Sequence, residues 1–174
     1  MPQIPPLPGA NVRSPSYFVA RASVRCPHCG LPTRLLALAL PHDHETLDED
    51  ARDEDEDEGG ATRPPEAWQR AGVHAFLFYV EQLPNEVRDR LSQLSRFFRP
   101  AHSTATLNTH WANHCEHCGR LLDDHELHCE PGAFMASSEA AAANIELVRI
   151  PEPFAAVAAG YAMEPEFFAC MRKS

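Results

Sequence analysis

The sequence lacks the features that direct a protein to a membrane or a secretory route. Its N-terminus, MPQIPPLPGANVRSPS, has no basic start followed by an apolar run, so it does not resemble a secretory signal. The longest apolar windows, such as FAAVAAGYAM from Phe154, reach about half of the roughly 20 residues that a spanning helix needs. We therefore expect a soluble, cytoplasmic protein with reduced thiols, in which paired cysteines more often bind metal than form disulfides.

Signatures of several enzyme classes are also missing. The chain has no Walker loop, no G-x-G-x-x-G and no G-x-S-x-G. A cytidine deaminase needs H-x-E before P-C-x-x-C, but here PHDHE follows the first cysteine pair and no P-C-x-x-C occurs. HELH, at 125–128, is one residue shorter than the zincin motif, and in an extended segment its histidines would point to opposite faces. The sequence thus predicts no catalytic residues and a protein that is not an enzyme.

Positive charge is scarce in a chain whose formal net charge is -10, and the only lysine is Lys173. Residues 43–58 hold eleven carboxylates and one arginine, so this segment alone carries the whole net charge. Outside it, fourteen carboxylates balance fourteen lysines and arginines. Like charges at this density repel and leave little to bury, so we expect residues 43–61 to form a disordered acidic loop.

Hydrophobic periodicity predicts an α+β fold, a sheet-plus-helix domain. Alternation over 17–24 indicates a strand, and further strands are expected at 33–40, 73–83, 103–111, 127–129 and 145–150. The best helix lies in 84–100, where Val87, Leu91, Leu94 and Phe98 share one face, Asn85 can cap the start and Pro100 stops it. Single helical turns are expected at 64–71 and 164–171, and Ser138 can cap a short alanine helix. We expect residues 1–15 to be a disordered proline-rich tail and 16–174 a single domain interrupted by the acidic loop.

Two C-x-x-C-G motifs carry the chemistry of the sequence. Cys26-Pro27-His28-Cys29 also occurs in the disulfide oxidant DsbA, but a thioredoxin-type site needs a helix that begins at the first cysteine. Gly30 and Pro32 would break such a helix, and a redox pair does not explain the second motif. Two facing turns, each with glycine after its second cysteine, can instead supply four thiolates in the tetrahedron of structural zinc.

At these motifs the chain resembles the zinc-ribbon superfamily, whose knuckles read C-P-x-C-G and C-x-x-C-G. They match Cys26-Pro27-His28-Cys29-Gly30 and Cys115-Glu116-His117-Cys118-Gly119, within about 50 residues of knuckles and flanking strands. The resemblance implies a small zinc-ribbon-like β-hairpin core, which we expect an inserted strand and helix to enlarge into the sheet-plus-helix domain. It also implies a zinc ion held by Cys26, Cys29, Cys115 and Cys118, although iron can use the same ligands. The 85 residues between the pairs exceed the usual spacing. The run WANHCEHCG is also similar to a signature of uncharacterised bacterial proteins, which implies no activity.

Other candidate ligands are weaker. His128 and Cys129 could contribute to a second metal site, but we favour Cys129 and Cys170 as small buried hydrophobic residues. Arginines on the first hairpin and on the long helix allow an anion-binding face, although a solvated surface is the simpler interpretation.

Two functional hypotheses follow. The first is a non-enzymatic, zinc-stabilised module that binds a protein partner. The second is a nucleic-acid-associated zinc ribbon in transcription or RNA metabolism, and a thiol–disulfide redox protein is a distant third. The sequence leaves the oligomeric state open. Because the chain has limited core-forming sequence, we expect the zinc ion to stabilise the fold and its removal by a chelator to unfold the protein.

Overall fold

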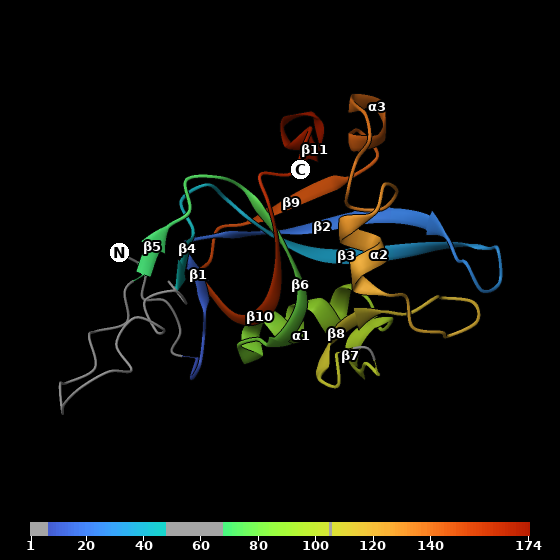
Figure 1. Ribbon diagram of the computed structural model, residues 1–174, viewed down its shortest axis with the longest axis horizontal. Coiled ribbons are helices and arrows are strands. Elements are labelled where there is room, and N and C mark those ends of the chain that lie inside the picture. Colours follow the sequence, from blue (N-terminus) through green and yellow to red (C-terminus); the bar gives the residue numbers. More distant parts are fainter. Residues whose placement is uncertain (1–6, 48–67, 105) are drawn as a thin grey trace, which may run out of the picture.

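The computed structural model describes residues 7–47, 68–104 and 106–174. They form one sheet with the strand order β11-β9-β2-β3-β6-β10-β1-β4-β5, and a β7–β8 hairpin branches from β6 (Figure 1). All strand pairs are antiparallel except β11 with β9. The elements are β1 Val12–Ser14, β2 Tyr17–Arg25, β3 Pro32–Leu40, β4 Glu45–Leu47, β5 Trp68–Arg70, β6 Ala75–Gln82, α1 Asn85–Leu94, β7 Phe98–His102, β8 Thr109–Asn113, α2 Asp124–Cys129, α3 Glu139–Ala142, β9 Glu146–Ile150, β10 Phe154–Met163, the 3₁₀ helix η2 Phe168–Cys170 and β11 Arg172–Lys173. The predicted α+β sheet-plus-helix fold is confirmed.

Hairpin β2–β3 lies within the sheet, between β9 and β6, and ends at the first cysteine pair. Its ladder runs without interruption from Phe18↔Ala39 to Arg25↔Pro32. The sequence predicts both strands correctly, β2 from its alternating pattern and β3 from its apolar run. The expected strands within 73–83 and 145–150 are also present, as β6 and β9.

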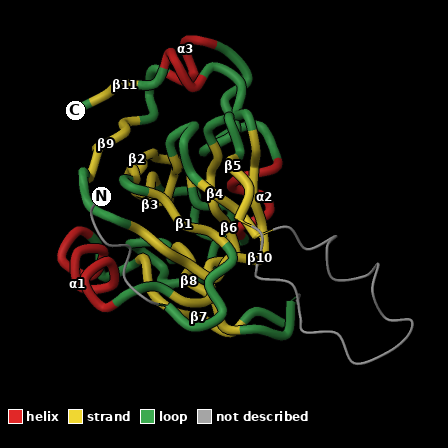
Figure 2. Tube along the Cα trace, turned by 90° about the vertical axis from the view of Figure 1, so that its left-hand side faces the viewer, coloured by secondary structure: helices red, strands yellow, loops and turns green. Residues whose placement is uncertain are grey.

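Apolar side chains cover both faces of the sheet. On one face, Phe18 and Leu35 pack in a cluster with Leu127 of α2, Ala142 of α3 and Phe168 of η2. The other face has its own cluster, which includes Val19, Leu36 and Leu38 together with Val87 and Leu91 of α1. Figure 2 shows α1 on the opposite side of the sheet from α2. The core is therefore divided into two layers with β2 and β3 between them.

Helix α1 is shorter than the predicted helix. It begins at Asn85, which is its first helical residue rather than its cap, and Pro84 holds the N-cap position without a side-chain hydrogen bond. It ends at Leu94 because Ser95 is extended. Phe98 and Pro100, expected to close the helix, lie instead in β7, paired with Asn113 and Trp111 of β8. Pairing with a distant strand thus outweighs the helical periodicity, and Pro100 is tolerated because β7 is an edge strand.

Several short segments also differ from expectation. Strand β1 lies within the expected tail and β4 within the expected acidic loop, because both pair with distant strands. Trp68–Arg70 forms a strand and not a helical turn, and residues 103–104 and 106–108 lie outside the strands, because β8 begins only at Thr109. Ser138 caps α3 as predicted, accepting a hydrogen bond from the Ala141 amide. The rest of the expected tail, 1–6, and of the expected loop, 48–61, lies outside the described residues, and the domain division stays a prediction.

The two leucines of α1 provide a test of the second cluster. Leu91 is completely buried, whereas the side chain of Leu94 is 40% exposed. We expect Leu91→Ala to lower the free energy of unfolding by about 2 to 5 kcal/mol, because it leaves a cavity. Leu94→Ala should lower it by less than about 1 kcal/mol. Urea unfolding followed by circular dichroism measures both, and equal losses would contradict this packing of α1.

Candidate metal centre

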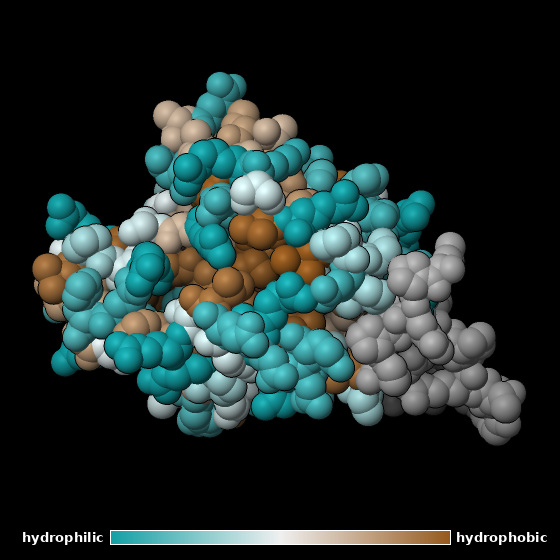
Figure 3. Space-filling model, turned by 180° about the vertical axis from the view of Figure 1, so that it is seen from behind, coloured by the Kyte–Doolittle hydropathy of each residue, from teal (hydrophilic) through white to brown (hydrophobic). Residues whose placement is uncertain are grey.

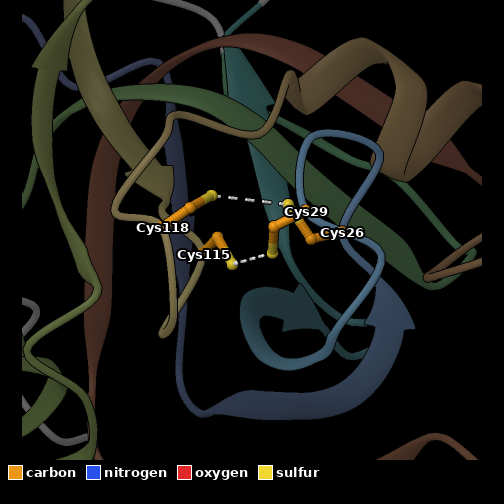
Figure 4. Close-up of side chains that lie close together, drawn as sticks. All are labelled: Cys26, Cys29, Cys115 and Cys118. Atoms are coloured by element: carbon orange, nitrogen blue, oxygen red, sulfur yellow. Dashed lines mark hydrogen bonds between the residues drawn. The ribbon is translucent and has the colours of Figure 1, made fainter.

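Four cysteine sulfurs meet at one end of the molecule. All four lie within 4.8 Å of one another (Figure 4). The Sγ atoms of Cys26 and Cys118 are 3.8 Å apart, and those of Cys29 and Cys115 are 3.6 Å apart. Sulfurs bound tetrahedrally at about 2.3 Å from an ion stand about 3.8 Å apart. The cluster therefore has the dimensions of a four-thiolate metal site, as the sequence predicts.

The two cysteine turns have the same backbone hydrogen bonds. In the first, the Cys26 amide donates to the Leu31 carbonyl at 2.9 Å, and the Gly30 amide donates to the Cys26 carbonyl at 2.8 Å. The amide of His28 points at the Cys26 sulfur, at 3.4 Å. The second turn, 115–120, repeats all three bonds at 2.9, 3.0 and 3.4 Å. These bonds define the two knuckles of the site.

Glycine is required in each knuckle by its backbone conformation. Gly30 has φ +75° and Gly119 has φ +70°, values that side chains of L-residues rarely allow. A Cβ atom at either position would have no neighbour within 4 Å, so space is not the constraint. After Gly30 the chain enters β3. The helix that a thioredoxin-type redox site needs after Cys26 is therefore replaced by a turn.

The pKa values of two of the thiols, those of Cys115 and Cys29, are shifted in opposite directions. Backbone hydrogen bonds at Cys118 and His117 lower the pKa of Cys115 to about 6. A hydrogen bond at Leu31 also lowers the pKa of Cys29, but desolvation and the neighbouring thiols outweigh it and raise this pKa to about 11. Four sulfurs at this spacing cannot all be thiolates unless a cation balances their charge. A metal ion supplies that charge, so the donor set fits a metal.

In each knuckle one cysteine is buried and the other is exposed. The first cysteine of each, Cys26 and Cys115, is buried within the apolar cluster of α2 and α3. The second cysteine of each, Cys29 and Cys118, is exposed. An ion bound by all four would have no open position for substrate, although it would lie close to solvent.

The HELH segment is helical, so the strand expected at 127–129 is wrong. Helix α2 begins after Asp123, whose carboxylate accepts hydrogen bonds from the amides of His125 and Glu126 at 2.8 and 3.3 Å. These bonds stabilise the first turn of the helix. The spacing Asp123-x-x-Glu126 is a capping signal that was present in the sequence.

Among the residues that the structure describes, neither His128 nor Cys129 belongs to a group of side chains that could hold a metal ion. His128 is buried, and its ring stacks on Phe78 and Phe134 at centroid distances of 5.4 and 5.0 Å. Cys129 and Cys170 are both exposed, so the expectation that they are small buried hydrophobic residues is wrong. Within the described ranges, the four knuckle cysteines are the only group of metal-ligating side chains close enough to share an ion.

Sequence reasoning missed the polar contact between α2 and β6. Asp124 is buried, and its carboxylate accepts a hydrogen bond of 2.9 Å from the Tyr79 amide. Burial raises the pKa of Asp124 to about 7. Tyr79 has φ +51°, an unusual value for a bulky residue, and this kink accompanies the contact. No local pattern in the sequence indicates it.

The chain was compared with protein-family models, curated proteins and solved structures, and none of them matches it. In the part of the chain that the structure describes, no helix is long and apolar enough to cross a membrane.

The burial of His128 predicts how the stability of the protein depends on pH. Desolvation lowers its pKa from 6.5 to about 3, so the folded protein binds this proton less readily than the unfolded chain. Stability is therefore retained above pH 6.5 and lost as the pH falls towards 3, by up to about 1.4 kcal/mol per pH unit. We expect His128→Phe to reduce this loss, as measured by urea unfolding between pH 4 and 7. His125→Phe, at an exposed position, should keep the wild-type slope, and an unchanged slope in His128→Phe would refute the assignment.

Proposed function

We propose that this protein is a non-enzymatic interaction module stabilised by one structural Zn²⁺ ion, bound by Cys26, Cys29, Cys115 and Cys118. The closed sulfur cluster carries the proposal. With four thiolate ligands, an ion has no free position for water or substrate, so it cannot act as a Lewis acid without losing a ligand. Zinc is the preferred ion because a four-thiolate tetrahedron is its usual structural site, and iron is the alternative.

The ion would stabilise one end of the sheet rather than the whole fold. The first knuckle follows β2 and the second follows β8, and the ion joins these two segments across 85 residues of sequence. The two apolar clusters extend well beyond this end, to α1 on one face and to α3 and η2 on the other. The core is therefore larger than the sequence suggested. Removal of the ion should lower the melting temperature without abolishing the folded state.

Metal content tests the shared site. We expect one equivalent of zinc per chain in the purified protein, and its loss in Cys115→Ser, because three thiolates hold zinc more weakly than four. Cys129→Ser is the matched control: this cysteine is also close to a knuckle in sequence but lies outside the sulfur cluster. Elemental analysis and thermal melting measure the effects. Full metal content in Cys115→Ser, or none in the wild type, would overturn the proposal.

An exposed apolar area supports a protein partner. Figure 3 shows apolar side chains gathered at the centre of one face, surrounded by polar ones. Contiguous apolar area on the surface of a soluble protein often marks an interaction site. This favours a protein partner over a role limited to holding metal.

Arginines on and near the knuckles favour the nucleic-acid alternative, but carboxylates pair with two of them. Arg34 pairs with Glu116 at 2.7 Å, and Arg21 pairs with Glu146 at 3.4 Å. A zinc ion with four thiolates also carries about two negative charges. These carboxylates and the anionic metal site reduce the local positive charge that could attract phosphate, which supports the protein-binding hypothesis, while Arg25 and Arg120 bond to the Gly30 carbonyl and the His28 ring instead.

Binding of mixed-sequence RNA and DNA distinguishes the two hypotheses. The test compares the full chain with a variant that lacks residues 48–58, a deletion that removes most of the acidic run and keeps strand β4. We expect no binding by either protein in fluorescence anisotropy at low salt. Salt-dependent binding that is stronger in the deletion variant would reject the protein-binding hypothesis in favour of the nucleic-acid one.

A further inference from the structure

Strand β6 pairs only with the end of strand β3 that is farther from the metal centre. Strand β6 pairs with it at Leu38↔Leu77, Ala39↔Phe76 and Leu40↔Ala75, and this ladder ends there. On the opposite side, β2 stays paired with β3 as far as Pro32. Side chains of Asn113, at the end of β8, and of Glu116 and His117, in the second knuckle, bind the part of β3 that is not paired with β6.

Asn113 takes the place of a strand residue at this edge. Its side-chain Nδ2 donates to the Leu36 carbonyl at 2.9 Å, and its Oδ1 accepts from the Leu36 amide, also at 2.9 Å. One side-chain amide thus satisfies both backbone groups of Leu36, as a neighbouring strand would. Asn113 is only 2% exposed, so these bonds are shielded from competing water.

Two further residues of the second knuckle continue along the same edge. Glu116 accepts from the Arg34 amide at 3.0 Å and from Arg34 Nε at 2.9 Å. Its own amide donates to Thr33 Oγ1 at 3.0 Å. His117 Nε2 lies 2.9 Å from the Pro32 carbonyl and donates to it. Bonds to the backbone of residues 32, 34 and 36 therefore hold the second knuckle along β3.

This arrangement gives both cysteine pairs a common support. Strand β3 begins three residues after Cys29, so it is continuous with the first knuckle. Asn113 is two residues before Cys115, and Glu116 and His117 lie inside the second knuckle. The distance between the knuckles is thus set by bonds within the protein.

We propose that Asn113 is a positioning residue that places the second knuckle opposite the first before an ion binds. The inference rests on the proposed metal site and extends it: the protein forms the site, and the ion completes it. Pre-forming the site removes part of the conformational cost of binding, which raises affinity. Loss of partners outside the ligand shell typically lowers metal affinity by about 10- to 100-fold.

Cobalt(II) is the probe for the test, because its thiolate complexes absorb visible light. We expect Asn113→Ala and the shape-matched Asn113→Asp, which lacks the amide donor, to bind Co²⁺ about 10- to 100-fold more weakly than the wild type. Competition with a chromophoric chelator measures the affinity. The matched control is Asn144→Ala. Asn144 is exposed, its side chain bonds to the nearby Ala140 carbonyl, and both residues are far from the four cysteines in the sequence. Urea unfolding confirms that each variant is folded.

A second readout needs no metal. Dibromobimane alkylates two nearby thiols, and peptide mapping identifies cross-links between 26–29 and 115–118. In metal-free protein we expect rapid cross-linking between the knuckles, slowed about tenfold or more in both Asn113 variants and unchanged in Asn144→Ala. Wild-type affinity and cross-linking rate in the Asn113 variants would overturn the inference. If the wild type binds no Co²⁺, the proposed function fails, while the cross-linking comparison still decides the role of Asn113.

Discussion

The continuous pairing of β2 with β3 is the interaction on which the rest of the structure depends. This hairpin separates two apolar clusters, so residues that alternate along it pack against α2, α3 and η2 on one face and α1 on the other. Its turn forms the first knuckle, and its open edge holds the second. The two apolar clusters, the candidate metal centre and the residues that hold the second knuckle all contact the same ladder of backbone hydrogen bonds, that of β2 and β3. On its two sides this hairpin pairs with β9 and β6.

The elements that could be predicted from the sequence are those specified by long local patterns. Strands β2, β3, β6 and β9 combine apolar runs with clear boundaries, and Ser138 marks the start of α3 in the usual way. The short strands β1 and β4 have no such pattern. Their stability comes from pairing, of β1 with β10 and of β4 with β5. Phe98 fits the apolar stripe of α1 but pairs with β8. In each of these cases, a distant partner decides the structure.

The candidate site shows the same division. Spacing within each C-x-x-C-G motif is local, and this is why the four cysteines could be chosen from sequence. In the proposed arrangement, their facing positions rest on Asn113 and on bonds such as those of Glu116, both to a strand about 80 residues earlier. Neither residue is distinctive in the sequence, since an asparagine and a glutamate near a turn have many possible partners. The buried contact of Asp124 with Tyr79 was hidden for the same reason.

The unequal burial of the sulfurs has a kinetic consequence. Cys26 and Cys115 lie inside the apolar cluster, and solvent reaches Cys29 and Cys118. A competing ligand that approaches a bound ion would meet the outer pair first, and the inner sulfurs would be the last to dissociate. An ion would therefore enter or leave this site from the side of the two exposed cysteines, Cys29 and Cys118.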